Sequence, residues 1–167
     1  NPIIFDTASL TVEPGPASYL TVTGINNPSI AGNPSNITVT VYDQYDNLAV
    51  NYSGTIHFTS TDPYPANLPS DYTFTPTDAG THIFANAVTL YTAGNQVVTA
   101  TDLDHPSING NQTVEVVPNV CSQVIINPAP TTTVIAGETL QFSAEAFDQY
   151  GNLITNDESQ FIWQGTG

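Results

Sequence analysis

The sequence contains one segment twice. VYDQYDNL begins at Val41 and AFDQYGNL begins at Ala146, an offset of 105 positions. The likeness extends without a gap over residues 30–58 and 135–163. Similarity at a fixed spacing indicates a structural unit that is used more than once. The chain is therefore expected to contain copies of one fold with a period of about 105 residues, a length that suits one small domain with its own core.

Short runs that alternate polar and apolar residues predict an all-β fold. In ITVTV, residues Ile37, Val39 and Val41 share one face of a strand. Strands are expected over 18–24, 36–43, 54–60, 71–76, 82–91, 95–102 and 111–117. Such short, regularly spaced strands are typical of a β-sandwich. The core residues expected are Val39, Val41, Phe58, Val98 and Trp163, and the second copy is expected to turn Phe142, Ala144 and Ala146 inward.

The repeated Asp-Gln-Tyr-x-Asn segment is predicted to be a turn. It follows the second expected strand in both copies. Asn, Asp and Gly tolerate left-handed backbone, and the side chains of Asn and Asp bond to nearby main-chain groups. These residues therefore suit the point at which the chain leaves one strand and heads for the next.

Several short motifs follow one another in a fixed order in the first copy. They are an Ala-Gly start (31–32), the Asp-x-x-Asp-Asn strand end (43–47), YSGTIHF (52–58), TDAGTH (77–82) and AGNQVV (93–98). This ordered set resembles the immunoglobulin-like modules found in tandem in bacterial and archaeal surface proteins, including invasin- and intimin-type adhesins. The resemblance implies an immunoglobulin-like antiparallel β-sandwich. The disulfide of antibody domains is missing, since the chain has one cysteine.

The repeat divides the chain into three expected parts. Residues 1–15 are interpreted as the last strand and linker of a preceding module, because DTASLTVEPGP resembles INGNQTVEVVPN. Residues 16–119 form a complete module, and residues 120–167 form the first half of a following one. A half sandwich exposes a sheet edge and an apolar face. Its completion is expected either from further residues of a longer chain or from a strand of another molecule.

The charge balance restricts the partners. The sequence has no Lys or Arg and fifteen Asp and Glu, a formal charge of −15. Nucleic-acid binding needs cations that displace counterions from phosphates, so it is excluded. No apolar run is long enough to insert into a membrane. The partners expected are neighbouring modules of the same protein, with self-association into fibres as an extension. A chain without trypsin sites suits an extracellular or cell-surface location.

Acidic turns suggest a calcium site. In a sandwich, the loops after the second and sixth strands lie at one end. These loops contribute Asp43, Asp46, Asn47, Asp102 and Asp104. Ca²⁺ takes six to eight oxygen ligands, which such a cluster can supply. The alternative is a set of solvated turns without an ion. The second copy has Gly151 at the position of Asp46, which weakens a site shared by both copies.

Two further features concern carbohydrate. Asn36, Asn51 and Asn111 each begin an Asn-x-Ser/Thr sequence, which can accept a glycan on a secreted protein. Tyr64 and Tyr72 flank the proline-rich loop DPYPANLPSDY, and exposed aromatic rings can bind sugars. The alternative for both tyrosines is a packing role as loop anchors.

No catalytic motif stands out. The three histidines fall on separate strands and loops, and nucleophilic catalysis needs a Ser or Cys beside an oriented base. The prediction is a non-catalytic structural or interaction module of an extracellular repeat protein, such as a stalk, filament or surface-layer element. The alternative is a carbohydrate- or receptor-binding adhesin module, or the accessory domain of a secreted polysaccharide-degrading enzyme.

Overall fold

The chain is built from β-strands. The computed structural model describes residues 13–129, 133–155 and 162. Among these residues, the one helical element is the 3₁₀ turn Pro76–Asp78. Within these described ranges, no helix is long and apolar enough to cross a membrane. The expected all-β class is confirmed.

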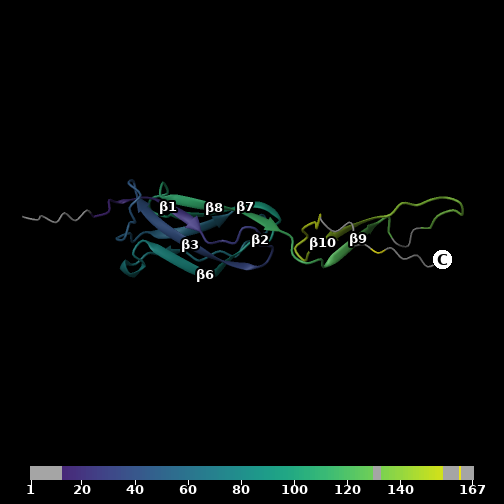
Figure 1. Cartoon of the computed structure of the whole chain (residues 1–167), viewed down its shortest axis with the longest axis horizontal. Helices are drawn as coiled ribbons and strands as arrows, with labels where there is room; N and C mark the ends of the chain where they lie inside the picture. The colour runs from purple at the N-terminus through teal and green to yellow at the C-terminus, as the bar shows by residue number, and fades with distance from the viewer. Residues whose placement is uncertain (1–12, 130–132, 156–161, 163–167) are drawn as a thin grey trace, which may run out of the picture.

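Residues 17–117, called here the first unit, contain two sheets (Figure 1). The three-stranded sheet has the order β1 (Ala17–Thr23), β3 (Pro34–Asp43) and β6 (Thr81–Thr89). The five-stranded sheet has the order β2 (Ser29–Ile30), β8 (Asn109–Val117), β7 (Gly94–Asp102), β4 (Thr55–Ser60) and β5 (Tyr72–Thr73). Neighbouring strands are antiparallel except for the parallel pair β2 and β8.

Seven strands lie near their expected places, but one is shorter than predicted. The strand expected over residues 71–76 is paired only at Tyr72 and Thr73. The chain then enters the 3₁₀ turn at Pro76. Because proline has no backbone N–H, it cannot continue the hydrogen-bonding ladder of the sheet.

The core lies between the two sheets of the first unit. Val39 and Val41 are fully buried on β3, while Phe58 and Val98 fill the facing sheet, as predicted. Burying a side chain of this kind contributes about 1.5–3 kcal/mol to stability. The buried cluster runs from Leu20 to Val116, so the first unit closes its own core. Trp163 lies outside the described residues.

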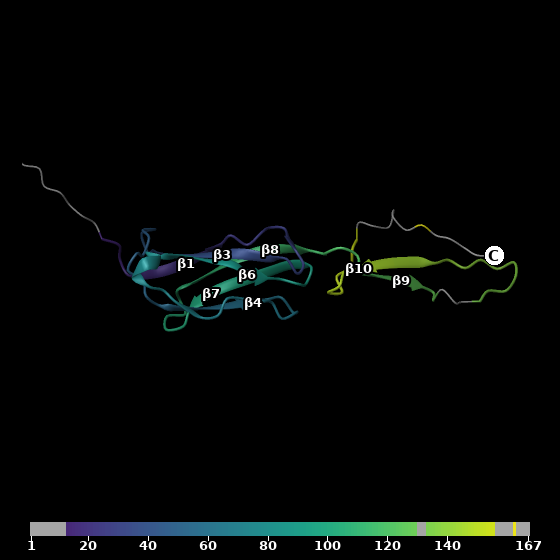
Figure 2. The same cartoon turned by 90° about the horizontal axis from the view of Figure 1, so that it is seen from below.

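A second unit, residues 123–154, follows beyond the end of β8 (Figures 1 and 2). It contains the antiparallel pair β9 (Gln123–Asn127) and β10 (Ser143–Phe147). Of the three residues expected to point inward, Ala146 is buried, Ala144 is half-buried and Phe142 is 38% exposed. Two strands present too little apolar surface to cover these side chains.

The two units share their strand pairing. Leu20 faces Val41 between β1 and β3, and Val124 faces Ala146 between β9 and β10. The neighbouring pairs follow in the same order in both units. After the turn, isolated bridges join Tyr42 to Leu48 and Phe147 to Leu153. The aligned segments therefore share their strand pairing at 38–42 and 143–147, but residues 34–37 belong to β3 while their counterparts 139–142 lie outside β10.

Candidate functional site

The repeated segment forms the same turn twice, beginning with residues 43–47. The side chain of Asp43 is buried, and its Oδ1 accepts hydrogen bonds from the backbone N–H groups of Tyr45 (2.8 Å) and Asn47 (2.9 Å). Asp46 has a φ of 65°, in the left-handed region that Asp tolerates better than most residues. The carboxylate thus holds the turn from inside.

Residues 148–152 form the matching turn. The Oδ1 of Asp148 accepts from the backbone N–H groups of Tyr150 and Asn152, both at 2.9 Å. Gly151, with a φ of 82°, occupies the left-handed position. The sequence prediction of a turn at both places is confirmed.

Each turn also holds the linker that enters its own unit. Gly15 N–H donates to Asp43 Oδ2 at 2.8 Å, just before β1 begins. Asn119 N–H donates to Asp148 Oδ2 at 2.9 Å, just before β9 begins. One carboxylate therefore fixes both the turn and the direction from which the chain arrives.

Hydrogen bonding keeps both carboxylates ionised. Burial alone would raise the pKa of Asp43, but the hydrogen bonds from Asn47, Gly15 and Tyr45 outweigh it and lower the pKa to about 2. Burial acts in the same direction on Asp148, and the hydrogen bonds it accepts hold its pKa below the ordinary value. Neither carboxylate needs a cation to remain charged at neutral pH.

Unlike the turn at 43–47, the turn at 148–152 also contacts a neighbouring unit, the one formed by residues 17–117. The side-chain amide of Asn152 donates to the carbonyl oxygen of Tyr91 at 2.7 Å. Its Oδ1 accepts from the backbone N–H of Ala93 at 2.8 Å. Asn152 is buried as a result, and its amide also donates to Asp148 Oδ2 at 2.8 Å. A buried amide with these partners links the two units through backbone groups of a loop.

Aromatic packing surrounds these hydrogen bonds. The ring of Tyr150 lies edge-on to Tyr91, with centroids 5.0 Å apart, and to Tyr64 at 6.0 Å. Tyr64 and Tyr91 contact each other at 4.9 Å. The Tyr150 ring also covers Gly32 so closely that a Cβ there would overlap its hydroxyl and ring carbons. Pairs of this geometry contribute about 0.5–1.5 kcal/mol each beyond the area they bury.

We call the surface formed by Gly32, Tyr64, Tyr91 and Ala93 the socket, and its contact with Tyr150 and Asn152 the joint. Asp62 organises the socket, since its Oδ2 accepts from Tyr91 N–H at 2.6 Å. Its Oδ1 accepts from Tyr64 N–H at 3.0 Å. A second link beside the socket runs from the Asn119 side-chain amide to Ala31 O at 2.8 Å.

At the other end of the first unit, the matching turn is open. Tyr45 is 73% exposed, and Asn47 is also exposed. The Asn47 amide donates only to Asp43, its own turn carboxylate, at 3.1 and 3.4 Å. The turn at 43–47 therefore forms without the contact to another unit that buries Asn152 in the turn at 148–152.

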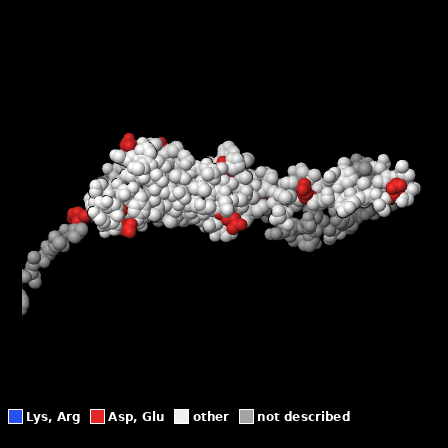
Figure 3. Space-filling model, turned by 90° about the horizontal axis from the view of Figure 1, so that it is seen from above, with Lys and Arg blue, Asp and Glu red and all other residues white. Residues whose placement is uncertain are grey.

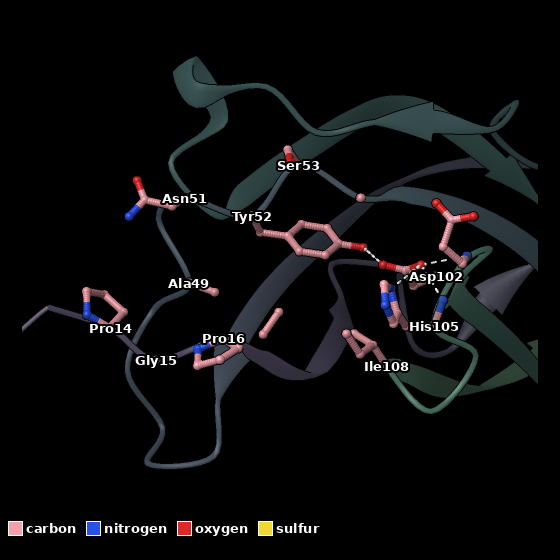
Figure 4. A pocket seen from close by; sticks show the side chains of 13 residues that line it. Pro14, Gly15, Pro16, Ala49, Asn51, Tyr52, Ser53, Asp102, His105 and Ile108 are labelled. Atoms are coloured by element: carbon pink, nitrogen blue, oxygen red, sulfur yellow. Dashed lines mark hydrogen bonds and ion pairs between the residues drawn. The ribbon is translucent and has the colours of Figure 1, made fainter.

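The residues predicted to bind calcium lie at this same end. Asp102 is buried; its Oδ1 accepts from the N–H groups of Asp104 and His105, and its Oδ2 from the Tyr52 hydroxyl (Figure 4). In the part of the chain that the structure describes, no three acidic, His or Cys residues are grouped to hold a metal. Acidic residues are scattered over the face shown in Figure 3. Calcium stays a prediction, which melting with 1 mM Ca²⁺ and with EDTA tests.

A pocket of about 540 Å³ opens beside these acidic loops. The linker residues Pro14, Gly15 and Pro16 form one wall, and Tyr52 and Asp102 lie opposite (Figure 4). The Tyr52 hydroxyl donates to Asp102 at 2.5 Å, so these two polar side chains on the side opposite the linker already bond to each other.

The histidines are paired with carboxylates. The Nδ1 atoms of His57 and His82 lie 2.6 and 2.7 Å from Asp71 and Asp78, while His105 lies 3.7 Å from Asp102. Among the residues described, no histidine hydrogen-bonds to a serine or cysteine. The arrangement that nucleophilic catalysis requires is thus not formed by these side chains.

The predicted carbohydrate residues separate into two groups. Asn36, Asn51 and Asn111 are all exposed, so a glycan has access to each. Tyr64 packs in the joint, and Tyr72 stacks on His82 with ring centroids 4.0 Å apart. The two tyrosines are not brought together in one aromatic row, and sugar binding stays a prediction.

Comparison with known proteins adds no assignment. No family model matches the chain, and no curated protein is significantly similar to it in sequence.

Sequence reasoning found half of the joint. Tyr150 and Asn152 belong to the repeated segment, but their repetition was explained as turn chemistry alone. The socket was missed, because Tyr91 and Ala93 act through a carbonyl and an N–H that every such residue has. Gly32 is the one socket residue that the sequence singles out, since a glycine follows Ile-Ala in both copies.

Proposed function

We propose that this chain is a non-catalytic structural segment of an extracellular or cell-surface repeat protein. Immunoglobulin-like β-sandwich units with a period of about 105 residues follow one another, and the repeated turn fixes each unit to the one before it. The segment acts as a stalk, filament or surface-layer element. Its work is to keep a defined length and direction.

One observation supports this proposal more than any other. The Asn152 side chain binds Tyr91 O and Ala93 N–H across the two units, while the turn that presents it is rebuilt at 43–47 with the same bonds. Units that move independently on a flexible linker would not bury an asparagine between them. A repeated turn with a buried amide instead suits a series of units held in one relative orientation.

The arrangement of the chain also suits transmission of force. The chain enters the first unit at one end and leaves β8 at the other, where the second unit begins (Figures 1 and 2). β1 is antiparallel to β3, and β8 is antiparallel to β7. Tension applied along the long axis therefore loads the hydrogen bonds of these ladders together.

Force spectroscopy on the full chain tests this role. With handles at both ends, the first unit should resist and then open in one cooperative event. An extended residue spans roughly 3.3–3.6 Å, so releasing residues 17–117 should lengthen the chain by about 300 Å once the length of the folded unit is subtracted. Smooth extension without a force peak would remove the mechanical role from the account.

A further inference from the structure

We propose that the open turn 43–47 is a docking surface for a second copy of this β-unit, placed ahead of it in the same chain. The socket of that copy takes Tyr45 and Asn47 as the socket of the first unit takes Tyr150 and Asn152. This inference rests on the proposed function and names the partner of its repeated surface. It starts from the exposure of Tyr45, which is 73%.

The open turn presents the groups that the socket binds. Gln, Tyr and Asn occupy the same positions in both turns, and a buried Asp holds each backbone in the same form. The Asn47 amide lies against Asp43, as the Asn152 amide lies against Asp148. Docking therefore requires no rebuilding of the turn.

The linker sets the direction of approach. Gly15 bonds to Asp43 as Asn119 bonds to Asp148, at nearly the same distance. A unit that ends in this linker therefore meets the open turn as the first unit meets the second turn. One link is lost, since Gly15 has no side chain to replace the amide that Asn119 donates to Ala31 O.

The one residue that differs inside the turn does not block docking. Asp46 stands where the second turn has Gly151. In the joint, Gly151 is exposed, and a Cβ added there would meet no atom within 4 Å. Asp46 is also held toward β1, because its Oδ1 accepts from the Tyr19 hydroxyl at 2.8 Å.

The chemistry of the socket favours a copy of this unit over other partners. It offers one carbonyl and one N–H at the spacing of a single side-chain amide, with tyrosine rings beside them. It requires no cation from the partner, in a chain that has no Lys or Arg. Covalent linkage raises the effective concentration of the two surfaces, so a modest contact is sufficient.

The experiment extends the chain by one unit. A copy of residues 13–118 is placed directly before Gly15, so that Pro118 precedes Gly15 as it precedes Asn119 at the joint. The added copy has Tyr45→Phe, which leaves one tyrosine at position 45 to report. Modification of tyrosines by a small nitrating reagent is followed by mass spectrometry in the original and the extended chain.

We expect the modification rate of Tyr45 to fall several-fold in the extended chain, toward that of Tyr150, at every protein concentration. Asn47→Asp should restore rapid modification in the extended chain and change little in the original one. Unchanged modification of Tyr45 beside a protected Tyr150 would overturn this inference alone. If Tyr150 is modified as fast as Tyr45 in the original chain, the joint fails, and the proposed function fails with it.

Discussion

The turns at 43–47 and 148–152 share their backbone, their buried aspartate and their bond to the incoming linker, yet they differ in exposure. The first is open to solvent, whereas in the second the socket covers Tyr150 and Asn152. The difference shows which features form the turn and which form the joint. Asp43 and Asp148 shape the backbone, and the asparagine amide donates to this carboxylate in both turns. The tyrosine ring and the asparagine amide contact another unit only in the second turn.

This comparison gives Tyr150 and Asn152 each a matched control in the same molecule. A substitution at position 150 or 152 removes turn contacts and joint contacts together. The same substitution at position 45 or 47 removes the turn contacts alone. The difference between the two variants is therefore the contribution of the joint.

The largest effect is expected from Gly32→Ala. The new Cβ overlaps the Tyr150 ring, so the tyrosine must leave the socket. Gly32 also has a φ of 81°, where alanine costs about 1–2 kcal/mol. Gly137→Ala is the control: it also places an alanine at a positive φ, 95°, but with no neighbour within 4 Å of the new Cβ. Nitration of Tyr150 should accelerate in the first variant only, and equal rates in both would show that Gly32 does not seat the ring.

Asn152→Asp should have the next largest effect. The carboxylate places a negative charge beside Asp148 and the Tyr91 carbonyl, in a chain without Lys or Arg. Losing buried hydrogen-bond partners costs about 1–3 kcal/mol. Asn47→Asp should cost less, because its site is exposed. Thermal unfolding measures the loss of stability in each variant, and the backbone amide signal of Ala93 reports on the joint. Only Asn152→Asp is expected to move the Ala93 signal.

Tyr150→Ala should weaken the joint without disturbing the turn. It removes two edge-on contacts, with Tyr64 and Tyr91, which contribute about 0.5–1.5 kcal/mol each. Tyr45→Ala removes an exposed ring and should leave the melting temperature nearly unchanged. Hydrogen exchange at the Asn152 side chain and the Ala93 amide reports on the joint. Faster exchange in both variants alike would contradict the assignment.

The smallest effect is expected from acid, because a protonated carboxyl still accepts hydrogen bonds. Asp148 has a folded pKa below its unfolded value of about 3.9. Its stabilisation is therefore complete above that value and is lost as pH falls through the folded pKa. For Asp43 the loss runs from that value down through its folded pKa of about 2. The Ala93 amide signal should stay constant down to about pH 4 and then shift, and Asp148→Asn should abolish that shift.

Much of the first unit was predictable, because its strands alternate cleanly. The positions of Ile37, Val39 and Val41 are enough to place one face of β3 in the core. The second unit was predicted less well. Phe142 follows the same alternation and yet remains 38% exposed, since alternation assigns a face but does not supply the sheet that covers it.

The joint could be predicted only in part for a different reason. The side chains of Tyr150 and Asn152 are visible in the repeated motif, but their partners are largely backbone groups brought close by folding. Asp62 prepares those groups from 29 positions away. Its role depends on the loops 62–64 and 91–93 meeting in space, which no local pattern in either loop indicates.

Residual dipolar couplings of backbone amides in a weakly aligned solution test the central claim most directly. They compare the orientation of the first unit with that of β9 and β10, averaged over motions up to milliseconds. If the joint fixes the two units, one alignment tensor fits the couplings of both, and Asn152→Asp separates them while Asn47→Asp does not. A second unit that requires its own, weaker tensor in the unmodified chain would contradict the account.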